Sequence, residues 1–247
     1  MRRKTGKTYR FEKKYLLDRD AAFVLKQRLS YIMQPDAFNT DGKYKVSTLY
    51  FDDQYNTSFF EKQNGLLIRD KFRARYYNDS LSMIRLERKH KYGEMVYKDS
   101  GILTSEQYFM MLRGDYAFMR ERSEQVFSDF YASNALKLMR PDVMINYHRQ
   151  AYTHPAGNVR ITFDSDLTAM EPQADHCFSI MSDNNHIMEV KYDNFIPSYI
   201  EGLLTGFAFT QLALSKFYIA KQVMSGMHSI KSGAQLQSLS NRRSDTG

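Results

Sequence analysis

The stretch GLLIRDKFRARYYNDSLSMIRLERKHKYGEMVYKDS, residues 65–100, decides the fold. It contains three runs of β-prone residues, which are separated by the turn signals Asn78-Asp79 and Gly93. The runs are GLLIRDKFRARYY (65–77), SLSMIRLERKHKY (80–92) and EMVYKDS (94–100). Strands that are joined by such tight turns lie side by side, so the stretch predicts a three-stranded antiparallel meander.

Charged side chains in these strands share one face. Successive side chains of a strand point to opposite faces, so those of Arg69, Lys71, Arg73 and Arg75 all point the same way. The second run repeats the layout with Arg85, Glu87, Lys89 and Lys91. The same parity recurs in Arg10, Glu12 and Lys14, at Arg149 and Arg160, and in Glu189 and Lys191.

Two interpretations of this pattern are open. The charged faces are either ordinary solvent-exposed faces of a sheet or the interior of a closed barrel. Like charges that face bulk water gain nothing from their mutual repulsion, whereas a polyanion inside a barrel would neutralise them. Five strands with the same preference therefore favour the barrel.

The rest of the chain adds strands and helices around the meander. The expected strands are residues 8–17, 43–53, 143–154, 158–167, a short 175–181 and 186–194. The expected helices are residues 21–33, capped by Asp18 or Asp20, two helices within 104–138 that are split at Gly114-Asp115, and a final amphipathic helix over about 200–224. A count of about eight strands predicts an α+β fold, an antiparallel eight-stranded β-barrel with helices packed outside.

Composition and charge exclude several classes of protein. With 43% hydrophobic and 26% charged residues among 247, the chain can bury a sizeable core, and it has no apolar run of a membrane span or signal peptide. We therefore expect a soluble, cytoplasmic protein in which the single Cys177 is a structural thiol. Six of the seven net positive charges lie in a basic segment, 1–7, and in a tail, 229–247, that we expect to be flexible. The expected domain, 8–228, is near neutral, which argues against a nonspecific nucleic-acid coat.

Charge within the domain is nevertheless concentrated. Residues 69–98 hold nine basic and four acidic side chains, so we expect an anion to meet this stretch. Phosphate chains suit such a lining, because each phosphoryl group offers several acceptor oxygens and a guanidinium binds them in pairs. Glu12, Glu87 and Glu189 would repel phosphate unless each is paired with a cation or holds a divalent metal, and both alternatives stay open. The sequence has no GxxxxGK[ST] motif, which disfavours a P-loop route.

Eight segments carry a family resemblance. They are FEKKYLL (11–17), STLYFDD (47–53), RARYY (73–77), LERKHK (86–91), NYHRQAY (146–152), VRITFDSDL (159–167), MEVKYD (188–193) and ALSKF (213–217). In this order they resemble the VTC domain, the polyphosphate polymerase branch of the CYTH-like triphosphate tunnel metalloenzymes. The resemblance covers about residues 8–222. It implies an antiparallel β-tunnel that is lined by Arg and Lys, holds a divalent metal and is closed by a C-terminal helix.

The resemblance also implies roles for individual residues. Catalytic roles fall to Arg73, Arg75, Lys89, Arg149, Arg160 and Lys216, substrate binding to Lys14, Lys98, Lys191, Arg69 and Lys71, and metal binding to Glu189 and Glu12. The superfamily often opens with two glutamates, but Arg10 stands in place of the first, so the metal is expected to rest chiefly on Glu189 and on phosphate oxygens. A lysine on an apolar helix normally extends to solvent, whereas the resemblance implies that Lys216 reaches the phosphate.

The function implied by the resemblance is an ATP-dependent polyphosphate polymerase that uses Mn²⁺ or Mg²⁺. The expected partners are ATP, polyphosphate or other phosphate anions, with no specific nucleic acid. If product crosses a membrane, a separate membrane protein must supply the path and would hold the chain at the inner face. The alternatives are an inorganic or nucleoside triphosphatase with the same tunnel and a non-catalytic polyphosphate-binding module. A nucleic-acid-binding module is disfavoured because no recognised fold signature of that class appears.

Overall fold

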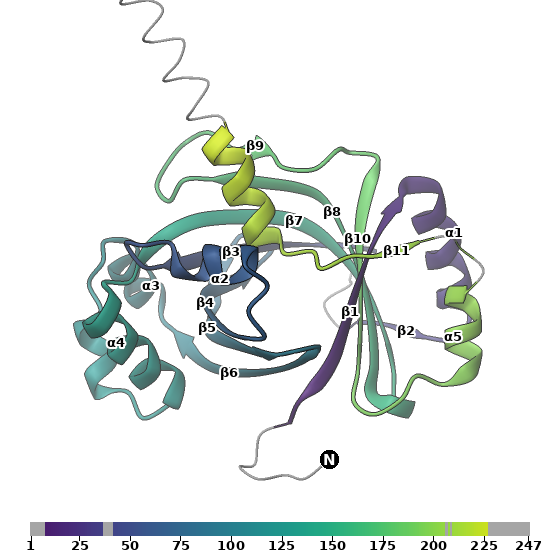
Figure 1. The fold of residues 1–247 in the computed structure, drawn as a ribbon, viewed down its shortest axis with the longest axis horizontal. Helices are drawn as coiled ribbons and strands as arrows, with labels where there is room; N and C mark the ends of the chain where they lie inside the picture. Colours follow the sequence, from purple (N-terminus) through teal and green to yellow (C-terminus); the bar gives the residue numbers. More distant parts are fainter. Residues whose placement is uncertain (1–7, 37–41, 206, 208, 227–247) are drawn as a thin grey trace, which may run out of the picture.

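Eight long antiparallel strands close into a barrel in the computed structural model of the chain, which describes residues 8–36, 42–205, 207 and 209–226 (Figure 1). They are β1 (Arg10–Asp18), β3 (Tyr44–Asp52), β4 (Ile68–Tyr77), β5 (Ser80–Tyr92), β6 (Met95–Leu103), β7 (Arg140–His154), β8 (Val159–Met170) and β10 (Asn185–Tyr192). Neighbours pair in the order β7-β3-β4-β5-β6-β1-β10-β8, and a pairing of β8 with β7 closes the ring. The predicted α+β barrel is therefore confirmed, while segments 1–7 and 229–247 lie outside the described residues.

The predicted meander forms β4, β5 and β6. Asn78 and Asp79 both adopt left-handed backbone conformations, with φ of 50° and 55°, as a two-residue hairpin turn requires. In the resulting register Arg73 lies opposite Glu87 and Lys71 opposite Lys89. The inward side chains of neighbouring strands are thus level with one another.

The single final helix predicted over 200–224 is wrong. The chain instead forms α5 (Ser198–Thr205), a short strand β11 (Thr210–Gln211) and a second helix over 216–226. β6 pairs with β1 only at Arg10 and Phe11, and β11 pairs with the same strand further along, at Tyr15 and Leu16. An open strand edge offers backbone groups that a helix cannot satisfy, so the chain is extended here. Two further short strands, β2 (Gln34–Pro35) and β9 (Phe178–Ser179), pair with β7 and β8.

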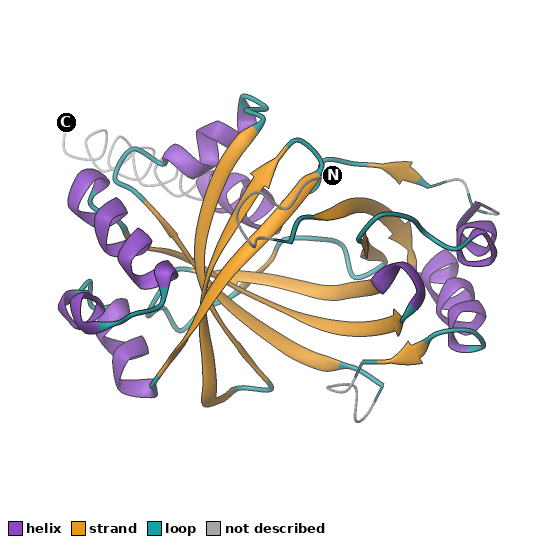
Figure 2. Cartoon of the chain, turned by 90° about the horizontal axis from the view of Figure 1, so that it is seen from below, coloured by secondary structure: helices purple, strands orange, loops and turns teal. Residues whose placement is uncertain are grey.

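Helices cover two opposite sides of the barrel (Figures 1 and 2). On one side lie α3 (Ser105–Leu112), a 3₁₀ helix η1 (Ala117–Glu121) and α4 (Gln125–Lys137), so the predicted split of 104–138 is confirmed. On the other side lies α1 (Arg19–Ser30), which begins at Asp18, whose carboxylate accepts a hydrogen bond from the Ala21 amide at 2.7 Å. Cys177 is exposed and adds nothing to the described core. No helix in the described part of the chain is long and apolar enough to cross a membrane.

An unpredicted helix, α2 (Thr57–Gln63), lies between β3 and β4. Its start is built by Asp52 and Asp53, which are almost fully buried and whose carboxylates accept hydrogen bonds from backbone amides of the first turn. The helix packs on the helix over 216–226, where the rings of Phe59 and Tyr218 stack at 5.0 Å. The Lys221 ammonium adds contacts to Asn56 at 2.9 Å and to Asp142 at 2.6 Å. These two helices therefore form one packed pair.

Packing between β6 and α4 depends on the absence of a side chain at Gly101. A Cβ atom there would overlap the ring of Phe127, which is fully buried. We expect Gly101→Ala to lower the free energy of unfolding by about 1–3 kcal/mol, as measured by chemical denaturation. Gly202→Ala on α5 is the control, because its Cβ would meet no atom within 4 Å and alanine favours a helix by about 0.5–1 kcal/mol. Equal stabilities of the two variants would contradict this account of the packing.

Candidate functional site

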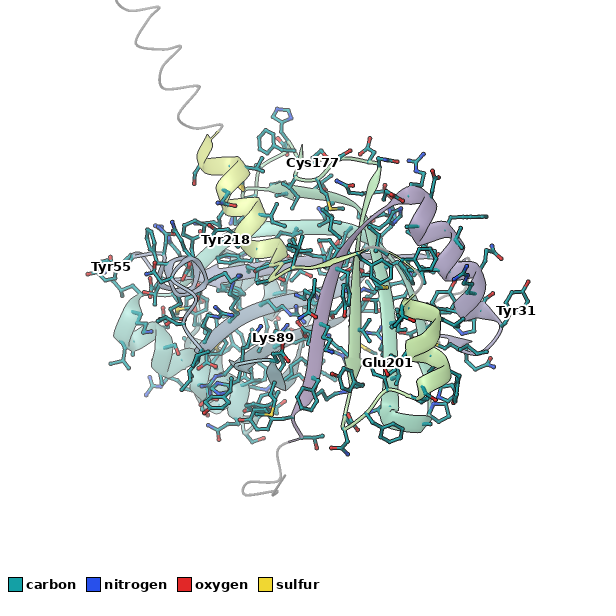
Figure 3. The ribbon with its side chains drawn as sticks, turned by 45° about the vertical axis from the view of Figure 1, so that its right-hand side comes forward. Tyr31, Tyr55, Lys89, Cys177, Glu201 and Tyr218 are labelled. Atoms are coloured by element: carbon teal, nitrogen blue, oxygen red, sulfur yellow. The ribbon has the colours of Figure 1, made fainter. Side chains whose placement is uncertain are left out.

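The barrel encloses a cavity of about 750 Å³, which we call the central cavity. All of the residues to which the sequence assigned a site role line it. They are Glu12, Lys14, Arg69, Lys71, Arg73, Arg75, Lys89, Lys98, Arg149, Arg160, Glu189, Lys191 and Lys216. Figure 3 shows Lys89 within the barrel, and the structure thus brings together side chains from seven strands and from the helix over 216–226.

Strand alternation separates this lining from the outer face. On β4 the residues between the cations point outward, and Phe72 and Ala74 pack against the helices of the α4 side. On β5 the guanidinium of Arg88 also points outward, where it binds Asp70 at 2.7 Å and Asp129. The basic face of the meander is therefore the barrel interior and not an ordinary solvent-exposed face.

The lining is strongly unbalanced in charge. Fifteen basic residues and three acidic ones line the central cavity. Two of the acidic ones are Glu12 and Glu189, and the third is Glu94. A cavity with this excess of positive charge attracts a polyanion.

Glu12 and Glu189 form the first of three carboxylate clusters. The Lys14 ammonium lies 3.3 Å from a carboxylate oxygen of each, Lys89 binds Glu12 at 2.7 Å, and Lys191 binds Glu189 at 2.7 Å. Burial would raise the pKa of both carboxyls, but the surrounding ammonium groups outweigh it and hold both pKa values well below the usual range. Both groups are therefore charged at neutral pH.

The same two carboxylates could hold a metal ion. They converge on the same two cations, Lys14 and Lys191, and carboxylate oxygens are ligands that Mg²⁺ and Mn²⁺ prefer. No group of three or more Asp, Glu, His or Cys side chains suited to a metal exists among the described residues. The pair therefore fits a divalent ion whose remaining ligands come from phosphate oxygens and water.

Glu87 belongs to a second cluster. Its carboxylate accepts a hydrogen bond from Arg73 Nε at 2.7 Å, lies 2.7 Å from Arg73 Nη2 in the same ion pair, and accepts a hydrogen bond from Lys98 at 2.5 Å. Burial acts to raise the pKa of Glu87, but Arg73, Arg75 and Lys98 lower it well below the usual range. The sequence left two roles open for Glu87, pairing with a cation or holding a divalent metal, and the structure shows it paired with cations.

Asp164 forms the third cluster and was missed by the sequence analysis. It is completely buried, accepts two hydrogen bonds from Arg149 at 2.6 and 2.8 Å, and binds the Lys216 ammonium at 2.6 Å. Lys216 is thus buried against the barrel wall and does not extend to solvent. The signal was present, because Asp164 shares the parity of Arg160 on β8 and points to the same face.

Other lining residues were also not anticipated. Lys62 reaches the central cavity from the unpredicted α2, and Tyr50 and Tyr147 add aromatic rings to the wall. Burial opposes ionisation of Tyr50, yet the neighbouring guanidinium groups of Arg73 and Arg75 lower its pKa. These residues lie on elements whose inward faces carry no run of charges, so parity alone gave no signal for them.

Lys71 lies in the central cavity without a carboxylate. Among the described residues its ammonium contacts only the Ser215 hydroxyl at 3.4 Å and the Phe217 ring, whose centroid lies 4.3 Å away. Burial, together with nearby cations of which Arg69 is the strongest, lowers the pKa of Lys71 to about 7. The empty cavity therefore carries less charge near pH 8 than a count of its lysines suggests.

Comparison with known proteins identifies the family of the chain and other proteins with a similar fold. A family model described as the VTC domain matches residues 9–225, whereas no curated protein matches the sequence. A candidate adenylyl cyclase from Hippeastrum, described as having a dominant triphosphatase activity, superposes with a TM-score of 0.54 at 13% identity, covering 87% of this chain and 95% of that one. A candidate adenylate cyclase from Bacillus halodurans gives a TM-score of 0.54 at 11% identity, covering 85% and 96%. These structural likenesses concern the barrel fold.

The parity of β4 and β5 leads to a binding prediction. Among the described residues Arg75 donates hydrogen bonds only to neutral groups, Thr48 at 3.1 Å and Tyr147 at 3.0 Å, so Arg75→Met removes no hydrogen bond from a described carboxylate. We expect this variant to bind tripolyphosphate more weakly by about 1.5–3 kcal/mol in calorimetric titrations. Arg88→Met is the matched control, because Arg88 points away from the cavity and its loss should leave the affinity unchanged. Equal losses would show that the assigned faces are wrong.

The lowered pKa of Lys71 leads to a second prediction. At pH 8 this amine is mostly neutral in the empty cavity, and a bound polyanion raises its pKa, so binding draws a proton onto it. We expect Lys71→Met to take up about one proton fewer than the native chain when tripolyphosphate binds at pH 8. Calorimetry in two buffers of different ionisation enthalpy measures this number. At pH 6 the difference should disappear, and an unchanged uptake at pH 8 would contradict the prediction.

Proposed function

The chain belongs to the VTC domain family, and from this premise we propose that it transfers the γ-phosphoryl group of ATP to a growing polyphosphate chain in the central cavity. The observation that carries the proposal is the excess of fifteen basic over three acidic side chains in the lining. A linear phosphate polymer is an acceptor and product that such a lining can hold along its length.

The proposed binding mode places the triphosphate between the walls that β4 and β7 provide. Arg75 is held by Thr48 and Tyr147, and Arg149 is held by Asp164, so both guanidinium groups are oriented before a ligand enters. A preorganised cation stabilises charge without a further cost of reorganisation. Lys71 has no carboxylate partner among the described residues, so its ammonium would bind a phosphate oxygen.

In the proposed reaction a terminal phosphate oxygen of the polymer attacks the γ-phosphorus atom. The new P–O bond lengthens the polymer by one unit, the bond between the γ-phosphorus and the β,γ-bridging oxygen breaks, and ADP leaves with the electron pair. No covalent protein intermediate is needed, because phosphoryl transfer is catalysed mainly by positioning and by charge stabilisation. Lys216, directed into the cavity by Asp164, would stabilise the charge that develops on the transferred group.

Glu12 and Glu189 would hold the divalent ion that the family implies, with Mn²⁺ or Mg²⁺ as the candidates. When bound, the ion supplies positive charge that neutralises phosphate oxygens. The lysines of this cluster keep both carboxylates ionised and therefore ready to act as ligands.

Hydrolysis of triphosphate is the second candidate function. The same residues could direct water to the γ-phosphorus, and the similar Hippeastrum protein is described as having a dominant triphosphatase activity. The deciding experiment incubates the full chain with ATP and Mn²⁺ or Mg²⁺ and resolves the products on a gel. A ladder of chains longer than three phosphates supports the polymerase. Free phosphate alone supports the triphosphatase, and tight binding without turnover supports a non-catalytic binding module.

The role of Glu189 leads to a further prediction, in which binding and turnover separate. Glu189→Gln removes one charge and little volume, so we expect turnover to fall by about 10²-fold or more. Metal-free tripolyphosphate binding should be kept or strengthened, because Lys14 and Lys191 lose a competing carboxylate. Glu94→Gln is the control, since it removes a carboxylate that also lines the cavity but forms no salt bridge among the described residues. Full activity of Glu189→Gln at saturating metal would reject the metal role.

A further inference from the structure

Four large apolar side chains are exposed together at the edge of the barrel. They are Leu66, Leu67, Ile68 and Tyr92, with 48%, 70%, 58% and 51% of their surface accessible, and we call them the apolar rim. Ile68 lies opposite Tyr92 in the pairing of β4 with β5, and the Gly93 amide donates a hydrogen bond to the Leu67 carbonyl at 3.0 Å. The four residues thus belong to one local unit, formed by the end of the loop after α2 and the β5–β6 turn.

Basic side chains border the apolar rim. Arg69 follows Ile68 directly and lies opposite Lys91, while Lys62 approaches from α2, and all three line the central cavity. None of them forms a salt bridge with another described residue. The acidic side chains of the same region are Glu61 and Glu94, so cations are in excess beside the exposed apolar surface.

We propose that the apolar rim is a docking surface for an anionic lipid bilayer. Leu66, Leu67, Ile68 and Tyr92 enter the interface between headgroups and acyl chains, while Arg69, Lys91 and Lys62 contact the acidic headgroups. Contiguous exposed apolar surface marks an interaction site, and attachment to a membrane surface gains both from buried apolar area and from attraction of cations to anionic lipids.

The arrangement favours a bilayer over a protein partner. The apolar side chains stand on a loop and beside a tight turn, are largely exposed, and are not among the residues that line the central cavity. A protein partner would have to bury Arg69 and Lys91, and it would need carboxylates placed for each of them. A bilayer needs no such match, because its headgroups are mobile and leave the cations hydrated. The proposal is independent of the catalytic function proposed above, since docking requires neither ATP nor turnover.

The test is sedimentation of the full chain with phosphatidylcholine vesicles, with and without phosphatidylserine. We expect binding only when phosphatidylserine is present. Leu67→Ser/Ile68→Ser should weaken it by about tenfold or more, because two inserted side chains are lost. Phe23→Ser is the matched control, since it removes an equally exposed apolar side chain, 61% accessible, from α1 on another side of the barrel. Both variants should keep the native unfolding midpoint and affinity for tripolyphosphate.

Three results would overturn the proposal. The first is failure of the native chain to sediment with phosphatidylserine vesicles, and the second is equal sedimentation of the rim variant and the native chain. The third is a loss of affinity for ATP, but not for tripolyphosphate, in a rim variant whose vesicle binding is unchanged, which would assign the rim to the nucleoside. Because vesicle binding is measured without ATP, failure of the polymerase proposal leaves each of these outcomes interpretable.

Discussion

Repulsion among the cations inside the barrel is the constraint on which the rest of the structure depends. Fifteen basic residues line one cavity, and in a buried setting the mutual repulsion of their inward side chains opposes closure of the ring. Three carboxylate clusters offset part of this repulsion, and each joins different elements. Glu12 on β1 binds a lysine on β5, Glu87 on β5 binds cations on β4 and β6, and Asp164 on β8 binds β7 and the last helix. The ion pairs therefore hold the barrel together at the places where charge would open it.

The carboxylates do not neutralise all of the cations in the barrel, and the cations left without a carboxylate are available to bind an anionic ligand. Lys71 has no carboxylate among the described residues, and Arg75 is held only by neutral hydroxyls. Burying such groups is costly, and the lowered pKa of Lys71 shows that the empty cavity limits the cost by releasing a proton. A polyanion removes the cost in another way, by supplying the missing charge. Binding energy and folding energy are thus linked through the same side chains.

Local periodicity explains what the sequence could predict. The two-residue repeat of a strand assigns each charged side chain to a face without knowledge of the fold, so the lining by Arg69, Lys71, Arg73 and Arg75 follows from spacing. Asp164 obeys the same rule and was overlooked. The break in the final helix could not be derived in this way, because it depends on the point at which β6 leaves the edge of β1. The position of Lys62 in the lining could not be predicted either, because α2 begins at two buried aspartates whose hydrogen-bond partners are backbone amides.

β1 connects the carboxylate cluster of Glu12 and Glu189 to the cluster of Asp164. The Leu212 amide donates to the Lys14 carbonyl at 3.0 Å, and the Lys14 ammonium, which lies between the two glutamates, donates to the Leu214 carbonyl at 3.2 Å. Lys216 follows two residues later and carries the chain to Asp164. A ligand or ion that binds the two glutamates therefore competes with an ammonium group that also contacts the segment leading to Lys216. Because the segment is short and is held by Lys14 at one end and by Asp164 at the other, it is the direct structural link between the two clusters.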